Sequence, residues 1–188
     1  MTRPVGRREM LGGLVKGGLA AALLPGTAAA AWRTVAAAST EAPLRVLDAP
    51  NARLVALVAD TILPRTETPG ATDVGVVRWI DTVAADYLPE AKRREFLDGL
   101  AAIDANAIAL TGSTLDALPA GAVAGVISGL DAACGRKSLV SAERGYALLK
   151  ELVVHGYFTS EPVQKDVLHA VIIPGRFDPS VPLKVTPT

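Results

Sequence analysis

The sequence predicts an all-α fold: a compact, bundle-like domain of about five to six helices, with extended proline-containing loops and a proline-containing tail. Half of the 188 residues are hydrophobic but only 4% are aromatic, and alanine, valine and leucine dominate. This composition favours helices that meet through small residues. Apolar residues recur at helical spacing after residue 48, whereas no alternating apolar and polar run is long enough to predict a sheet.

The first 31 residues follow the order of segments found in a secretory leader. Adjacent Arg7 and Arg8 precede a weakly hydrophobic stretch of 14 residues. Pro25 ends that stretch, and the three alanines at 28–30 offer a small-residue cleavage pattern. The arginine pair is typical of the twin-arginine export route, which moves proteins that have already folded. The alternative interpretation is a genuine N-terminal helix that the protein keeps as an anchor.

We therefore expect a signal peptide over 1–31, a flexible lead-in segment over 32–47 and a helical domain over 48–188, located in the periplasm. The leader holds four basic side chains and one acidic side chain, so the remainder has 15 basic and 18 acidic residues, a net charge of −3. A mildly acidic domain without clusters of lysine and arginine is a poor candidate for binding nucleic acid or an anionic membrane surface.

The first helix of the domain is expected to begin at Asp48, which can cap it, with Pro50 in the first turn. Apolar side chains follow at helical spacing until Pro64 ends the helix. Residues 64–71 are expected to form an extended loop, because each proline disfavours helix in the residue before it.

Three further helices are expected between this loop and Gly135. Asp73 can cap the first of them. Pro89 is expected to start the second, which the Thr-Gly-Ser sequence at 111–113 closes. Pro119 is expected to start the third, which ends near Gly135.

The last expected helices lie between Ser141 and Ala170. Ser141 can cap a helix that Gly156 ends. Ser160, within the Thr-Ser-Glu-Pro sequence at 159–162, can cap a short helix after it. The tail from Ala170 onward is expected to be extended, because its prolines block further helix.

The sequence contains no recognisable catalytic, cofactor-binding or metal-binding motif. Cys134 is the only cysteine, which excludes an internal disulfide, a c-type haem attachment, an iron–sulfur cluster and a cysteine zinc site within the chain. His155 and His169 stand alone, with no further ligand at metal-binding spacing. The sequence also lacks a nucleophile elbow, a dinucleotide fingerprint and a phosphate-binding loop. We therefore expect no active site in this chain.

Two segments are unusual enough to predict an interaction surface. The proline-containing loop over 64–70 is either a stiff connector or a recognition arm, because prolines lower the entropy that docking would remove. Residues 156–160, Gly-Tyr-Phe-Thr-Ser, place two aromatic side chains at a helix end. These aromatics either close the core or contribute to a partner surface, where aromatic residues are enriched.

At the loop, the sequence resembles a known family. Residues 60–71, Asp-Thr-Ile-Leu-Pro-Arg-Thr-Glu-Thr-Pro-Gly-Ala, are similar to the signature of the gluconate 2-dehydrogenase subunit 3 family. Phe-Leu-Asp-Gly-Leu at 96–100, Gly-Tyr-Phe-Thr-Ser-Glu at 156–161 and Ile-Pro-Gly-Arg-Phe at 173–177 agree with it. The resemblance covers residues from about 54 to about 178, nearly the whole of the expected domain.

The resemblance implies a non-catalytic role in an oxidoreductase complex. Proteins of this family are small accessory subunits of bacterial flavin-dependent sugar and polyol dehydrogenases of the GMC type. The large partner carries FAD and oxidises the sugar, glycoside or gluconate, and a cytochrome c subunit with c-type haem takes the electrons. The small subunit carries the twin-arginine signal and assists the maturation and export of the large one through the twin-arginine translocase. Membrane association through the partner subunits is also implied.

We expect the loop and the aromatic segment to contact the large subunit. The candidate partner-interface residues are Pro64, Arg65, Thr66, Pro69, Gly70, Tyr157, Phe158, Thr159, Ser160, Pro174 and Gly175. The alternative is a freestanding periplasmic binding or scaffold protein without an oxidoreductase partner. An enzyme in its own right would need a catalytic set that the sequence does not contain.

Overall fold

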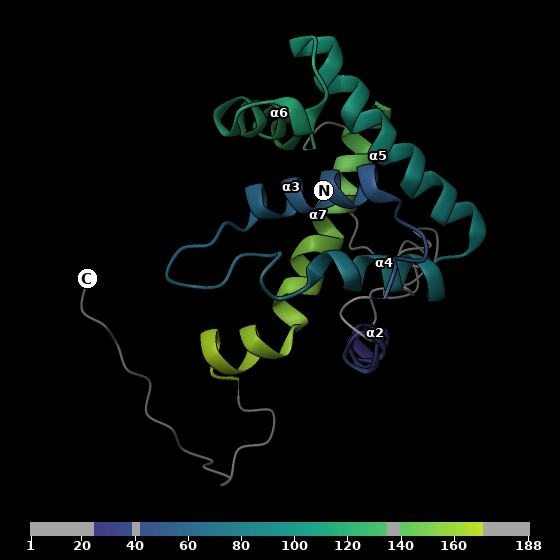
Figure 1. Ribbon diagram of the computed structural model, residues 1–188, viewed down its shortest axis with the longest axis vertical. Helices are drawn as coiled ribbons and strands as arrows, with labels where there is room; N and C mark the ends of the chain where they lie inside the picture. Colours follow the sequence, from purple (N-terminus) through teal and green to yellow (C-terminus); the bar gives the residue numbers. More distant parts are fainter. Residues whose placement is uncertain (1–24, 39–41, 135–139, 171–188) are drawn as a thin grey trace, which may run out of the picture.

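The chain folds into a helical domain (Figure 1), in a computed structural model that describes residues 25–38, 42–134 and 140–170. The elements in chain order are α2 (Pro25–Ala37), α3 (Ala49–Ile62), α4 (Val76–Asp86), α5 (Glu90–Thr111), the 3₁₀ turn η1 (Leu115–Ala117), α6 (Ala120–Ala133), α7 (Ser141–Thr159) and the π-helical turn η2 (Val163–Val167). These ranges contain no strand, so the predicted all-α fold class is confirmed. Throughout the described part, each helix is either too short or too polar to cross a bilayer.

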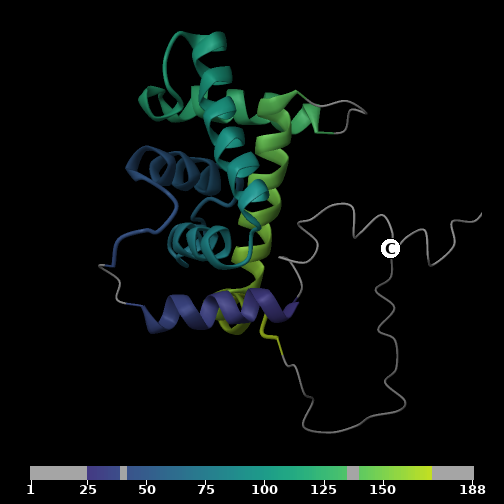
Figure 2. The same cartoon turned by 90° about the vertical axis from the view of Figure 1, so that its right-hand side faces the viewer.

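The antiparallel helices α5 and α7 form the axis of the domain (Figures 1 and 2). They approach closely where two glycines face each other: a Cβ added to Gly99 would lie 2.7 Å from the Cα of Gly145. The helices α6, α3, α4 and α2 follow one another along this axis, and each contacts α7 (Figure 2). Because α7 is the common contact, its buried face organises most of the core.

The core is built from large aliphatic and aromatic side chains contributed by nearly every helix. The largest fully buried side chains are Trp79, Tyr146, Phe96, Ile80, Leu100, Ile103, Leu115, Leu149, Leu152, Val55, Val58 and Val76. Burying a side chain of this size stabilises the fold by about 1.5–3 kcal/mol relative to leaving it in water. The helical spacing therefore predicted the inward faces of α6 and α7 correctly, and that of α5 from Phe96 to Ala107. The same spacing also placed Leu110 on this face of α5, which is wrong: Leu110 lies near the end of the helix and is 66% exposed.

Trp79 explains why α7 does not end where the sequence predicted. Gly156 was expected to end that helix, but α7 continues to Thr159. A Cβ at Gly156 would lie only 2.7 Å from Cε3 of Trp79. The glycine is therefore required for close packing against the indole and does not act as a helix terminator.

Several predicted helix ends are confirmed. The Asp48 carboxylate accepts a hydrogen bond from the backbone N–H of Asn51 at 2.9 Å, and it caps α3. Pro89 and Pro119 immediately precede α5 and α6. Gly112 ends α5 in the left-handed region at φ 79°, which glycine adopts without strain.

Three predicted caps are wrong because the side chains bond elsewhere. Asp73 binds the preceding loop, and α4 begins three residues later, after Gly75. Ser141 is the first residue of α7, whose capping contact is instead Glu143 accepting from the N–H of Val140 at 2.9 Å. The hydroxyl of Ser160 donates to the carbonyl of Tyr157 at 2.7 Å, so it satisfies the end of α7 rather than the start of the next turn.

The expected flexible lead-in over 32–47 differs from the structure in its described parts. Residues 32–37 belong to α2. Residues 45–47 are held by the buried carboxylate of Asp81, which accepts three backbone N–H groups at 2.8–2.9 Å. The packing of α2 therefore holds residues 32–37, and the buried carboxylate of Asp81 holds residues 45–47. Arg7 and Arg8 of the expected leader, and the tail beyond Ala170, lie outside the described residues.

His155 should make the stability of the domain depend on pH. Its ring lies 5.8 Å from that of Trp79, and burial lowers the pKa of His155 below its ordinary 6.5, opposed by the charge of Glu151. The folded chain therefore disfavours the charged imidazole, and the unfolded chain binds more protons between the lowered pKa and 6.5. Stability that is fully present above pH 6.5 is consequently lost as pH falls toward the lowered pKa.

We expect the urea midpoint of the wild type to fall between pH 7.5 and pH 5.5, which are about one pH unit above and below the ordinary value. The variant His155→Gln should lose part of this dependence because it cannot take up the proton. The exposed His169 provides the control, since His169→Gln should behave as the wild type. An unchanged pH slope in His155→Gln would contradict the assignment.

Candidate partner interface

The loop between α3 and α4 is closed by its own backbone hydrogen bonds. The N–H of Ala71 donates to the carbonyl of Leu63 at 3.0 Å, and the N–H of Thr66 donates to the carbonyl of Thr68 at 3.0 Å. These bonds bring the two arms of the loop together. Residues 64–67 at its outer end remain exposed.

Asp73 fastens the two arms from the side. One oxygen of its carboxylate accepts from the backbone N–H of Gly70 and from Nε of Arg65, both at 2.7 Å. The pKa of Asp73 is lowered below its ordinary value. The largest cause is the hydrogen bond from the Gly70 N–H, and the next is the hydrogen bond from the Arg65 guanidinium. A Cβ at Gly70 would lie 3.0 Å from the backbone nitrogen of Arg65, so a larger residue would press the arms apart.

Asp60 anchors the loop to α3. Its carboxylate accepts from the backbone N–H of Thr72 at 3.0 Å and from the hydroxyl of Thr72 at 2.7 and 2.9 Å. The second arm of the loop is thereby held against the last turns of α3. The loop is ordered by these contacts before any partner arrives.

Tyr157 joins the loop to the far end of α7. Its hydroxyl donates to the carbonyl of Pro69 at 2.8 Å. The adjacent Phe158 packs edge-on against the Tyr157 ring, with centroids 5.2 Å apart, yet leaves 40% of its surface exposed. The fold therefore brings together the two segments that the sequence singled out, and Figure 1 shows the loop extending beside the C-terminal half of α7. We define the loop–Phe158 surface as residues 64–67 together with Phe158.

The candidate residues divide into exposed and supporting positions. Pro64, Arg65, Thr66 and Phe158 are exposed and available for direct contact. Pro69 is half-buried. These five positions form or border the loop–Phe158 surface.

The remaining described candidates lie beneath the surface. Gly70, Tyr157 and Ser160 are buried, so in this conformation they support the surface and do not contribute contact area. Thr159 is half-buried and accepts a hydrogen bond from Nε1 of Trp32 at 3.1 Å. Pro174 and Gly175 lie outside the described residues.

Sequence reasoning missed the carboxylates that shape the loop. Asp60 stood within the quoted signature without a role, and Asp73 was assigned to helix capping. Both bind backbone N–H groups of the loop, at separations of 12 and 3 residues respectively. A carboxylate close to a proline-rich loop was the available signal, but capping and loop-bracing carboxylates look alike in sequence.

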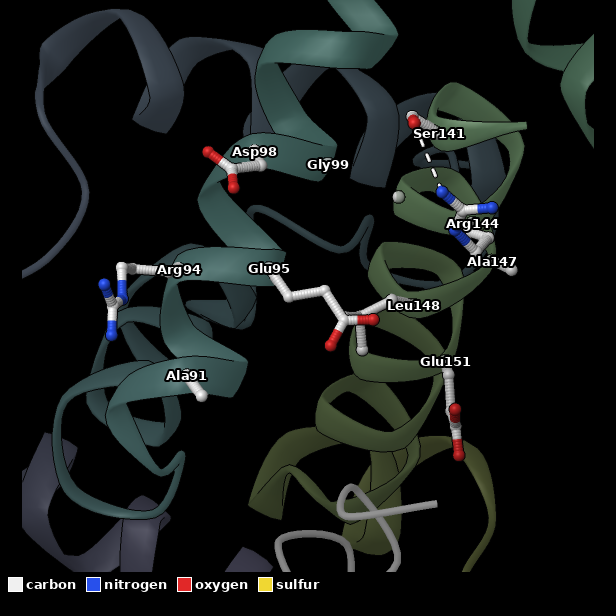
Figure 3. A pocket seen from close by; sticks show the side chains of 11 residues that line it. Ala91, Arg94, Glu95, Asp98, Gly99, Ser141, Arg144, Ala147, Leu148 and Glu151 are labelled. Atoms are coloured by element: carbon white, nitrogen blue, oxygen red, sulfur yellow. Dashed lines mark hydrogen bonds between the residues drawn. The ribbon is translucent and has the colours of Figure 1, made fainter. Parts of the chain in front are cut away.

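A groove with a volume of about 720 Å³ lies between α5 and α7, away from the loop–Phe158 surface (Figure 3). Its walls carry Arg94, Glu95, Asp98, Arg144 and Glu151. Arg94 is paired with Glu90 on its own helix at 3.5 Å, and Glu95 is paired with Lys92 at 2.7 Å. Among its side chains, Ser141 accepts from Arg144 at 3.2 Å. The groove therefore presents charged helix faces of both signs.

The thiol and imidazole groups do not assemble into a site within the described residues. The Cys134 thiol is half-buried and bonds to the carbonyl of Leu130 at 3.3 Å, and burial raises its pKa. Burial therefore disfavours the thiolate form of this side chain. In the described ranges, histidine, cysteine and acidic side chains do not gather in threes that could hold a metal ion.

The hydrogen bond from Tyr157 to Pro69 can be tested directly. In Tyr157→Phe, amide hydrogen exchange over residues 64–72 should accelerate, because the loop loses its tie to α7. The global free energy of unfolding should fall by only about 1 kcal/mol, the usual net value of one hydrogen bond. Tyr87→Phe, at the residue that follows α4, serves as a matched control. Unchanged exchange in the loop would show that Tyr157 does not hold it.

The described chain is thus a small helical domain whose distinctive surface is a braced loop beside an exposed aromatic side chain. A sequence profile described as "Gluconate 2-dehydrogenase subunit 3" matches residues 49–175. The chain therefore belongs to the gluconate 2-dehydrogenase subunit 3 family, as its motifs suggested. The match begins at the first residue of α3 and includes both segments of the loop–Phe158 surface. Neither the curated proteins nor the solved structures contain a match to this chain.

Proposed function

We propose that this chain is the non-catalytic small subunit of a periplasmic flavin-dependent dehydrogenase acting on sugars, glycosides or gluconate. It docks on the large catalytic subunit through the loop–Phe158 surface. Membership of a family named for a dehydrogenase subunit supports the accessory role. The observation that carries the docking proposal is the braced loop, which Tyr157 ties to the C-terminal end of α7 beside the exposed Phe158.

The physics of association favours this surface. Loop ordering normally opposes binding, but here the contacts of Asp60, Asp73 and Tyr157 have already imposed it. Arg65 has 74% of its side chain exposed and Phe158 is 40% exposed. Arginine and aromatic side chains are the types enriched in interface cores. Because the loop that carries Arg65 is already formed and lies beside Phe158, it needs little rearrangement to bind a partner.

The export role follows from combining the leader with this docking. In our proposal the large subunit folds and takes up FAD in the cytoplasm and then binds this chain. Arg7 and Arg8 then direct the folded complex to the twin-arginine translocase. In the periplasm a cytochrome c subunit with c-type haem accepts electrons from the flavin and ties the complex to the membrane. This chain contributes docking and transport to that sequence.

The proposal is tested by recovering the tagged, full-length chain from the periplasm of its own host. A yellow eluate with flavin absorbance and a second, larger polypeptide would support the small-subunit role. It would also provide the enzyme for assay against sugars. A colourless chain that elutes alone, under conditions that keep complexes of about micromolar affinity, would reject the role. That result would favour a freestanding binding or scaffold protein instead.

A further inference from the structure

The residues expected to form the signal cleavage site are part of the folded domain. The alanines at 28–30 lie within α2, which crosses the C-terminal end of α7 and packs on α4 (Figure 2). Ala28 and Ala31 are completely buried, whereas Ala29 between them is exposed. Burial that repeats at this helical spacing is typical of a helix packed on one side.

Two tryptophans hold α2 in place. The Nε1 of the fully buried Trp79 donates to the carbonyl of Ala28 at 3.3 Å. Trp32 stacks on Trp79, with ring centroids 6.1 Å apart and an interplanar angle of 29°. Its own Nε1 donates to the hydroxyl of Thr159 at 3.1 Å. Contacts on both sides of the bond between Ala30 and Ala31 therefore tie α2 to α4 and α7.

Removing the segment before Ala31 would damage the domain. The Trp79 indole would lose its hydrogen-bond acceptor at Ala28, and its ring would lose part of its cover. His155, whose Nε2 is buried without a partner in the described part of the chain, lines the cavity beneath α2 together with Ala28 and Ala29. Cleavage there would admit water to both rings.

A protease also needs its substrate segment released from the fold, because a bond within a packed helix becomes accessible only after local opening. To open here, α2 must break the stack of Trp32 on Trp79 and expose two buried alanines at the same time. A protein that folds before export meets its peptidase in the closed state.

We propose that folding protects the bond after Ala30, so that α2 remains part of the exported subunit and seals the core over Trp79. Under this proposal the removable part of the leader ends before α2, short of the expected boundary at residue 31. Retention of α2 in an exported subunit rests on the function proposed above, whereas protection of the bond depends only on the folded chain.

The protection is measured on the full-length chain purified from the cytoplasm. An elastase, which cuts after small residues, is added at native conditions and in urea, and cuts within residues 26–31 are timed by mass spectrometry. The wild type should be cut there at least about tenfold more slowly than in urea, as expected for sites that need local opening. Equal rates in the two conditions would overturn the proposal.

A pair of variants separates docking of α2 from general loss of stability. Trp32→Ala removes the stack and the Thr159 bond, and it should speed cutting within residues 26–31 by at least about tenfold. Arg33→Ala changes the exposed neighbour and should match the wild type. Cuts elsewhere in the chain provide the internal reference and should stay constant in both variants. A Trp32→Ala chain as resistant as the wild type within residues 26–31 would overturn the role assigned to the stack.

The mass of the chain recovered from the periplasm completes the test. An N-terminus before Ala28 would support retention of α2. An N-terminus at Ala31 would overturn it while leaving the accessory role intact. A chain that resists elastase but never leaves the cytoplasm would instead reject the export proposal and support the protection.

Discussion

Replacing Asp81 with alanine is expected to lower the free energy of unfolding by about 3–5 kcal/mol, because three backbone N–H donors, one buried and two partly buried, then lose a charged acceptor. Asp81 is only 3% exposed and accepts the N–H groups of three consecutive residues, 45–47, at 2.8–2.9 Å. These bonds hold residues 45–47 against α4. A loss of this size is a large fraction of the 5–15 kcal/mol typical of a domain.

Urea unfolding followed by circular dichroism measures the effect. The control is Asp86→Ala: Asp86 lies on α4 like Asp81, and the substitution removes its exposed ion pair with Arg45 at 2.8 Å. An exposed pair typically contributes less than about 1 kcal/mol, even with good geometry. If the two variants lost equal stability, the account of Asp81 as the anchor of residues 45–47 would be wrong.

Replacing Gly145 with alanine should destabilise the domain by about 2–3 kcal/mol, although alanine is the better helix former by about 1 kcal/mol. The new Cβ would lie 2.5 Å from the carbonyl oxygen and 2.6 Å from the Cα of Gly99. Both obstacles are backbone atoms, which cannot rotate away as a side chain can. The helices α5 and α7 would have to separate, and the core on either side of the crossing would loosen.

Gly125→Ala on α6 is the matched control, because a Cβ there meets nothing within 4 Å. The control should gain about 0.5–1 kcal/mol from helix propensity alone. Chemical denaturation of the two variants side by side separates packing from propensity. Stabilisation of the chain by both substitutions would show that α5 and α7 are not in close contact.

The sequence predicted most of the helical elements because helices leave local signals. The 3.6-residue spacing of apolar side chains, Asp48 before a proline, and Pro89 and Pro119 at helix starts all act within one turn. The π-helical turn after Ser160 was also expected as a short helix, though without its wider geometry. These elements need no tertiary information to be recognised.

The errors occurred where tertiary contacts override a local signal. Gly156 has the form of a helix terminator, but it makes room for a tryptophan 77 residues earlier in the chain. Asp73 and Ser141 have the form of caps, but Asp73 instead braces a loop. A helix at the N-terminus was kept only as the alternative interpretation, because the alanine-rich sequence of α2 also has the composition of a cleavage region, and the contact of α2 with Trp79 is not visible in the sequence.

The candidate site was predicted as two separate segments. Prolines and aromatics marked them, and the resemblance to the family joined them to one function. Their contact depends on the bond between Tyr157 and Pro69, which spans 88 residues and leaves no trace in sequence spacing. The fold was also needed to divide the candidates into exposed and supporting residues. Phe158 and Tyr157 are adjacent in sequence, yet Phe158 is 40% exposed and Tyr157 only 4%.

The most direct test of the proposed docking compares two exposed apolar residues at opposite ends of the α5–α7 axis. Phe158 lies on the proposed surface and is 40% exposed, whereas Leu110 near the end of α5 is 66% exposed and lies outside that surface. Each is changed to aspartate in the tagged chain, and the amount of flavoprotein recovered from the host is measured per mole of tagged chain. We predict that Phe158→Asp recovers at least about tenfold less flavoprotein, as expected for a contact worth more than about 1.4 kcal/mol, and that Leu110→Asp matches the wild type. Equal recovery with Phe158→Asp and the wild type would contradict the account.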